Sequence, residues 1–339
     1  MVGNGVCLCD GVGTVCHYFI PDIFDFPELP SLGLLRWRSA LKIRSTVRSA
    51  VSGAYQRPGL RMEMVRKAVI YGLLILGVGV FMLPLIVMVS TSLKSFTEIN
   101  SYPPSFLPKK LIFTNYAEAL VDRDTMFPRW TFNTIFIIGA ILPGVVISSS
   151  LCAYGFARMT FPGRDLWFML VLGSIMLPPQ VTLIPLYILF YKIGWLNTFA
   201  PLIIPAWFGG GAINIFLLRQ FYMQIPRELD EAAIIDGAGF MTIWWRIYVP
   251  LGRPALISVA LLTILGNWND FFGPLMYLNT PDNYTLALGL NAFRNYFPLL
   301  PRTDYLMAIA TLMVLPMILM FLLAQRYIVQ GFVTSGLKG

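Results

Sequence analysis

The sequence predicts an all-α integral membrane protein with six transmembrane helices, and three features of the chain predict it. The first is composition: of the 339 residues, 57% are hydrophobic and only 12% are charged, with a mean hydropathy of +0.69. A soluble domain is roughly half apolar and about a quarter charged. The second feature is the length of the apolar runs. The third is the distribution of Lys and Arg among the segments that join these runs.

Residues 1–61 precede the apolar runs and differ from the remainder in composition. They are predicted to be disordered or to be an extension from an upstream start codon. Three of the four cysteines and the only histidine lie here, namely Cys7, Cys9, Cys16 and His17. Their spacing fits none of the common zinc patterns, so no metal site is predicted.

Six apolar runs are long enough to cross a bilayer, which requires about 20 mostly apolar residues. They cover roughly 68–92, 130–157, 166–190, 199–222, 254–277 and 305–325. Each run is continuous rather than alternating, which favours helices over membrane β-strands. Prolines and a short helical stretch near Asn115 follow the first run and suggest a folded cap. The third run contains Pro178 and Pro179, so we expect its helix to break there.

The basic residues set the predicted orientation. With the N-terminus in the cytoplasm and six spans, 17 of the 25 Lys and Arg residues fall on the cytoplasmic side. This agrees with the positive-inside rule and accounts for the net charge of +8 without nucleic-acid binding. Both termini and the segment 223–253 are then predicted to be cytoplasmic.

The segment 223–253 is a polar, acidic stretch between the fourth and fifth runs. A helix is predicted to start at Pro226 and to stop near Gly237, where glycine is favoured. A second short amphipathic helix is predicted over 240–248, ended by Pro250. The first helix carries acidic residues early, as its N-terminus favours: Glu228, Asp230 and Glu231.

This segment resembles the EAA loop of ABC importer permeases. Six residues fall at the family's spacing: Glu231, Ala232, Ala233, Gly237, Ile247 and Pro250. The one departure is Val249, where Leu is usual. In the family this loop inserts into a groove on a separate ATPase subunit and transmits its closure to the membrane helices. The resemblance therefore implies that these six residues, with Asp236, dock the ATPase.

Further motifs are similar to those of carbohydrate-uptake permeases, nearest to the type found in maltose importers. They include Leu-Pro-Pro-Gln at 177–180, Asn-Trp-Asn-Asp-Phe at 267–271 and Gly-Leu-Lys-Gly at 336–339. The resemblance implies a permease domain over 62–339 that forms half of a sugar pathway in a bacterial or archaeal cytoplasmic membrane. It also implies three partners: a sibling permease subunit, an ABC ATPase dimer and an extracytoplasmic solute-binding protein. The chain itself would hold no cofactor, since the partner ATPase uses the ATP.

Four polar side chains within or beside the spans are candidates for the substrate pathway: Gln180, Asn214, Asn267 and Asp270. Polar groups in spans are costly, so a functional role is the first hypothesis. Each also has a structural alternative. Asn267 and Asp270 share a helix face and could bond another helix or cap an interface. Gln180 could satisfy carbonyls freed by the prolines, and Asn214 could bridge helices.

An enzyme is not predicted, because no phosphate-binding loop, Ser-His-Asp set or metal cluster can be assembled. An ABC permease for a polyol, glycerol phosphate or another non-sugar substrate remains the alternative function. A secondary transporter would need coupling carboxylates deep in the spans, and Asp270 alone is too little.

Overall fold

The structure is a computed structural model that describes residues 60–121, 126–296 and 302–336. Within these ranges the chain is helical and contains no strand, in agreement with the predicted all-α class. The predicted tail 1–61 lies outside the described residues except for its last two positions. Its cysteines and histidine therefore lie outside them as well.

The helical elements follow one another along the chain, with short irregular connections between most of them. Their bounds are α2 Leu60–Ser92, α3 Phe96–Ile99, α4 Thr114–Val121, α5 Phe127–Arg158, α6 Arg164–Ser174, α7 Pro179–Lys192, α8 Ala200–Ile203, the 3₁₀-helix η1 Ile204–Trp207, α9 Ala212–Tyr222, α10 Glu228–Ile235, α11 Phe240–Ile243, the π-helix η2 Trp244–Tyr248, α12 Val249–Leu251, α13 Arg253–Trp268, α14 Phe272–Tyr277, the 3₁₀-helix η3 Pro281–Asn283, α15 Leu286–Tyr296 and α16 Thr303–Gly336.

Four segments of the described chain are long and apolar enough to cross a membrane: Met64–Ser92, Phe127–Arg158, Ala200–Tyr222 and Thr303–Leu323. A fifth is added if Phe240–Leu251 and Arg253–Trp268, bent by 79°, count as one span. The predicted third run is divided into α6 and α7, each too short to qualify. Its break before Pro179 confirms the effect expected of the two prolines. The predicted fifth run also differs, because α13 ends at Trp268 and α14 begins only at Phe272.

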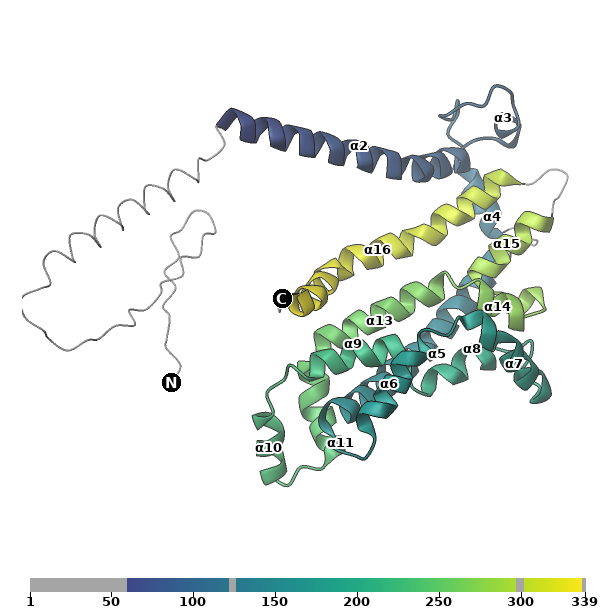
Figure 1. The fold of residues 1–339 in the computed structure, drawn as a ribbon. Coiled ribbons are helices and arrows are strands. Elements are labelled where there is room, and N and C mark those ends of the chain that lie inside the picture. The colour runs from purple at the N-terminus through teal and green to yellow at the C-terminus, as the bar shows by residue number, and fades with distance from the viewer. Residues whose placement is uncertain (1–59, 122–125, 297–301, 337–339) are drawn as a thin grey trace, which may run out of the picture. The chain divides into compact units, whose positions relative to one another are not determined.

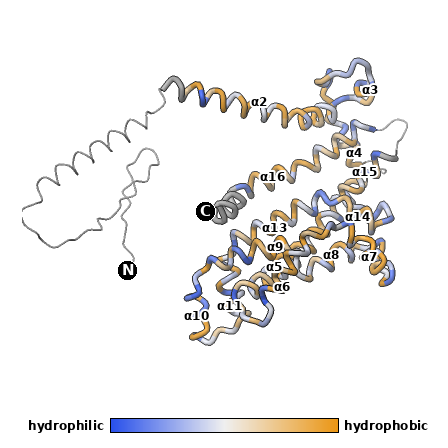
Figure 2. Tube along the Cα trace, viewed as in Figure 1, coloured by the Kyte–Doolittle hydropathy of each residue, from blue (hydrophilic) through white to orange (hydrophobic). Residues whose placement is uncertain are grey.

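The chain divides into two compact units, residues 1–80 and residues 81–339. The described part of the first unit is the beginning of α2, whose apolar side chains from Met64 to Val80 are almost all exposed. Figure 2 shows that hydrophobic residues dominate this helix. Such a helix, apolar around its surface, is typical of a membrane span.

The second unit is organised around α5, which packs against α9 and α13 (Figure 1). Buried residues form two cores along α5. One core lies toward its C-terminal end and joins α5, α6, α9, α11, η2 and α13. The other lies toward its N-terminal end and joins α4, α5, α13, α15 and α16. The 223–253 loop and the α14–α15 region therefore lie at opposite ends of the bundle.

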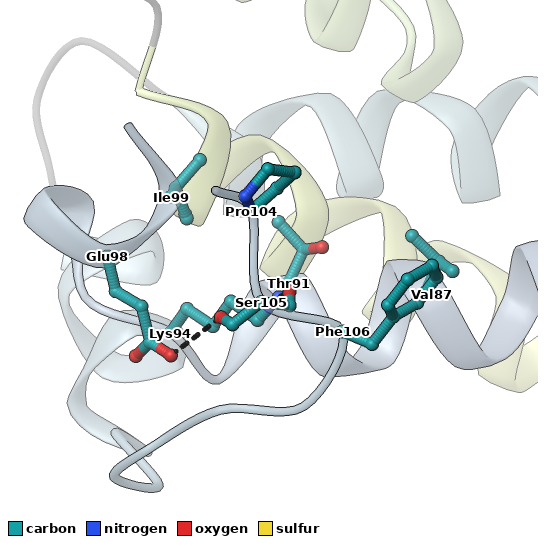
Figure 3. Close-up of a pocket in the computed structure, with 8 residues that line it drawn as sticks. All are labelled: Val87, Thr91, Lys94, Glu98, Ile99, Pro104, Ser105 and Phe106. Atoms are coloured by element: carbon teal, nitrogen blue, oxygen red, sulfur yellow. Dashed lines mark hydrogen bonds between the residues drawn. The ribbon is translucent and has the colours of Figure 1, made fainter. Parts of the chain in front are cut away.

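The segment 93–113 forms a compact cap between α2 and α4. Asn115 donates to the carbonyls of Ser92 and Lys94 at 2.9 and 2.8 Å. Glu98 accepts from the Ser105 hydroxyl and from the Lys109 backbone N–H, both at 2.9 Å. The Lys109 N–H is the main cause that lowers the pKa of Glu98. A pocket of about 260 Å³ lies between this cap and the end of α2. Figure 3 shows the side chains that line it. The folded cap predicted after the first run is thus present.

Candidate functional site

The first helix of the 223–253 loop, α10, ends in a complete Schellman motif. Gly237 adopts φ of 78°, in the left-handed region that favours glycine. The N–H of Gly237 donates to Ile234 O and the N–H of Ala238 to Ala233 O, both at 2.9 Å. These two bonds satisfy carbonyls that the helix end leaves open. The helix begins at Glu228, two residues after the expected start at Pro226.

The second helical piece of the loop is longer than the sequence predicts. It starts at Phe240 as expected but continues through η2 and α12 to Leu251. Pro250 therefore does not end it. A proline near the start of a new α-helical turn lacks an N–H that would in any case have no partner there, which explains why Pro250 is tolerated in α12. The chain bends at Gly252 instead, where α13 leaves at 79°.

The seven residues expected to dock an ATPase divide into two groups by exposure. Glu231, Ala232, Asp236, Gly237 and Pro250 are exposed, whereas Ala233 and Ile247 are partly buried against the core. The exposed group is therefore free to meet another protein, and the other group holds the loop to the bundle.

Several large apolar side chains of the same loop are also exposed, and the sequence reasoning did not single them out. Ile235 is 85% exposed. Others, each more than half exposed, are Ile234, Phe240, Met241 and Trp245. Figure 2 shows α10 beginning with hydrophilic residues and ending with hydrophobic ones. Exposed apolar residues beside acidic ones are typical of a surface that a partner covers.

Beneath the loop, a polar cluster ties α10 to the end of α5. The Tyr248 hydroxyl donates to both Asp230 carboxylate oxygens at 2.8 and 2.7 Å. Arg158 Nη1 lies 3.7 Å from Asp230 Oδ2. Arg158 Nη2 also donates to Tyr222 O at 2.6 Å and to Ile225 O. One guanidinium group thus contacts the end of α9, the linker that follows it, and α10.

A second set of bonds extends this cluster into the core. The Ser150 and Tyr222 hydroxyls are 2.7 Å apart, and Trp244 Nε1 donates to Ser150 Oγ at 2.9 Å. The Tyr248 ring packs against the rings of Tyr154 and Tyr222, with centroids 4.9 and 5.2 Å away. All of these side chains, Ser150 included, are buried. The contacts join α5, α9 and η2 into one packed unit.

A cavity of about 670 Å³ lies beside α5, near the breaks in the predicted third and fourth spans. It contains two of the four pathway candidates, Asn214 and Asn267. Apart from these amides, its polar side chains are Ser174 and Thr263, and no Asp, Glu, Lys or Arg is among the described residues that line it. The rest of the lining is aliphatic side chains and glycine.

Only two of the four pathway candidates line this cavity. Asn214 donates to Gly210 O at 2.7 Å and Asn267 donates to Thr263 O at 2.8 Å, so each amide bonds its own segment. Asp270 accepts from Gly273 N at 3.2 Å near the start of α14. Gln180 is exposed in the first turn of α7. Neither of the last two is among the residues that line the cavity.

Comparison with known families identifies the family of the chain. Residues 126–334 match the family described as binding-protein-dependent transport system inner membrane component. This match covers more than half of the sequence. The chain belongs to this family. It is therefore an inner membrane component, and its apolar helices cross that membrane.

Curated relatives of this inner membrane component match over most of their length. AraQ of Halalkalibacterium halodurans, an arabinooligosaccharide transport permease, is 31% identical over 76% of this chain and 91% of its own. MalG of Thermococcus litoralis, a trehalose/maltose permease, is 34% identical over 70% and 86%. UgpE of Brucella suis, an sn-glycerol-3-phosphate permease, is 31% identical over 78% and 94%.

The fold of the inner membrane component also matches solved structures. A chain of a bacterial ABC transporter involved in the import of alginate superposes with a TM-score of 0.68 at 24% identity, over 80% of this chain and 98% of that one. A second alginate transporter structure, in complex with a periplasmic protein, gives a TM-score of 0.56 at 17% identity. These likenesses support the fold.

The sequence reasoning found the exposed part of the loop but missed its attachment. Nothing in the sequence pairs Arg158, just after the second apolar run, with Asp230, near the start of the predicted loop helix. Their spatial neighbours come from distant parts of the chain, so spacing alone could not pair them. One available signal was the type of residue: an Arg in the last turn of an apolar helix is stabilised by the helix dipole and often finds an acidic partner.

Proposed function

We propose that this chain is the permease subunit of an ABC importer for neutral sugars or oligosaccharides. It would form half of the translocation pathway, together with a sibling permease subunit. An ABC ATPase dimer would drive it, and an extracytoplasmic binding protein would deliver the sugar. The observation that carries this proposal is the match, over most of their length, to permeases named for arabinooligosaccharide and trehalose/maltose transport. Those relatives are transport proteins, which supports a chain without catalysis of its own.

The cavity beside α5 favours a neutral sugar over the main alternative, a phosphorylated substrate. Its described lining contains amide and hydroxyl groups but no charged side chain. An anion such as glycerol phosphate is normally bound by Arg or Lys, whereas sugar hydroxyls are recognised by neutral donors and acceptors. The likeness to UgpE keeps the glycerol phosphate alternative open to experiment.

Six membrane helices remain our proposal for the architecture. Besides the four helices of sufficient length, α13 and α14, joined by the break at 269–271, support a fifth span over the predicted run 254–277. α6 and α7 together, joined by the break at 175–178, support a sixth. A broken span is tolerated where it borders protein or a water-filled cavity. Ile175 and Leu177, which lie in this break, line the cavity.

Transport by the reconstituted importer tests the proposal. The complex of both permease subunits, ATPase and binding protein should take up a neutral oligosaccharide into proteoliposomes when ATP is supplied. Glycerol 3-phosphate should neither be taken up nor compete. Uptake of glycerol 3-phosphate in place of the sugar would overturn the neutral-substrate proposal.

Asn267→Ala tests whether the cavity beside α5 contributes to the sugar pathway. Its amide nitrogen bonds Thr263, which leaves the side-chain oxygen free to accept from a sugar hydroxyl. We expect the half-saturating sugar concentration or the uptake rate to worsen about fivefold, the factor for one neutral hydrogen bond of about 1 kcal/mol. Asn269→Ala is the matched control, because Asn269 also bonds the carbonyl four residues earlier but is exposed outside the cavity. Equal effects of the two variants would contradict a role for Asn267.

A further inference from the structure

Few contacts attach α10 to the rest of the bundle. The helix makes little contact with other described helices, and most of its side chains are exposed. Its inward contacts are Ala233, which packs against the core, and Asp230, which Tyr248 and Arg158 hold. Any movement imposed on α10 by a partner therefore reaches the bundle through these contacts and through the two short linkers at its ends.

Arg158 also binds the linker between α9 and α10. Its Nη2 donates to the carbonyls of Tyr222 and Ile225, which bracket the turn between α9 and α10. The side chain is only 6% exposed, and that of Asp230 is 16% exposed. A charge pair shielded from water in this way is held more strongly than a surface pair. The last turn of α5, the linker and α10 are thus tied to one side chain.

Tyr248 completes the connection on the other side. Its hydroxyl donates a hydrogen bond to the Asp230 carboxylate, while its ring packs between Tyr154 of α5 and Tyr222 of α9. The Arg158 guanidinium also lies 5.2 Å from the centre of the Tyr248 ring. Polar bonds thus hold α10 to Tyr248, and aromatic packing holds Tyr248 to two long helices.

We propose that Arg158, Asp230 and Tyr248, here called the Arg158 junction, are positioning residues that convert movement of α10 into movement of α5 and α9. The proposal rests on the proposed function, because it presumes that an ATPase moves the loop. The three side chains themselves are beneath the exposed docking surface. Their loss should therefore uncouple the partner's movement from the membrane helices without releasing the partner. α5 carries that movement to the cavity, since Ile141 and Val145 line it.

The test uses Asp230→Asn and Tyr248→Phe in the full importer, with the sugar carried per ATP hydrolysed as the readout. Tyr248→Phe keeps the ring and removes only the hydroxyl bonded to Asp230. We expect both variants to assemble with the ATPase in wild-type yield and to hydrolyse ATP. The sugar carried per ATP should fall roughly tenfold, within the range of typical coupling free energies. A role in folding alone would lower the yield of complex and leave this ratio unchanged.

Two variants serve as matched controls. Asp165→Asn removes the carboxylate of an exposed pair with Arg164, 3.0 Å apart, and should leave the ratio unchanged. Tyr191→Phe removes an exposed hydroxyl on α7 and should also have no effect. Arg158→Lys keeps the charge but cannot reach the same set of acceptors, so it should resemble the junction variants.

Failure of the junction proposal and failure of the proposed function give different results. If the wild-type complex transports sugar and the junction variants keep the wild-type ratio, the junction proposal is overturned by itself. Loss of the ATPase from the junction variants would overturn it too, since it would assign these residues to docking. If the wild-type complex hydrolyses ATP but carries no sugar, the proposed function falls, and this inference falls with it.

Discussion

Replacing Glu231 by Lys is expected to abolish sugar uptake while the membrane helices still insert. Glu231 is exposed in the first turn of α10, where a carboxylate complements the helix dipole. A lysine there costs the helix only about 0.3–1 kcal/mol, too little to unfold it. Complete loss of uptake would therefore report a lost contact with the ATPase. The measurement is uptake in cells together with pull-down of the ATPase.

Glu231→Gln is the matched control, because it keeps the shape and the acceptor oxygen but removes the charge. It should retain part of the uptake. Gly237→Asp should behave like Glu231→Lys, since it strains the left-handed backbone and adds a charge on the exposed side. Apart from the two neighbouring residues, no atom of the described structure lies within 4 Å of the position a Cβ at residue 237 would take, so the added carboxylate starts from open space that a partner can occupy. Normal uptake by both Glu231→Lys and Gly237→Asp would refute docking through this loop.

The second large effect is expected for Gly252→Ala, at the bend between α12 and α13. A methyl group there would lie 2.6 Å from the Tyr248 carbonyl oxygen and 2.7 Å from Tyr222 Cε1. Both neighbours belong to the core beneath the loop, so relief requires backbone movement. Overpacking of this kind costs about 1–3 kcal/mol. The apparent melting temperature of the purified chain in detergent should fall clearly.

Gly239→Ala provides the comparison for that measurement. Gly239 has an ordinary φ of −75°, and nothing lies within 4 Å of the added methyl group. The melting temperature of the Gly239→Ala chain should stay at the wild-type value. A Gly252→Ala chain as stable as Gly239→Ala would show that the bend at Gly252 relaxes without strain.

Features fixed by local chemistry were predictable from the sequence. Pro178 and Pro179 remove backbone donors, and the helix break falls beside them. The apolar-to-polar change placed the loop at 223–253, and α9 ends at Tyr222 while α13 begins at Arg253. Such signals depend on the residues themselves and their immediate neighbours.

Features that depend on tertiary contacts were not predictable in the same way. The break between Trp268 and Phe272 falls inside the predicted run 254–277, because that run was identified by its length and apolar composition. The helix was expected to end at Pro250, but the structure continues it and places the bend at Gly252, against Tyr222. Asn214 and Asn267 come together only because α9 and α13 both line one cavity.

Site-specific cross-linking from Ile235 tests the central claim most directly. Ile235 is among the most exposed apolar side chains of the loop, at 85%, and a photoreactive residue there should cross-link to the ATPase subunit in the active importer. The same photoreactive residue in place of Tyr102, which is 96% exposed in the cap between α2 and α4, should give no cross-link to the ATPase. Cross-linking at 235 alone is the result we predict. An active importer in which position 235 gives no ATPase product, or position 102 does, would contradict the account.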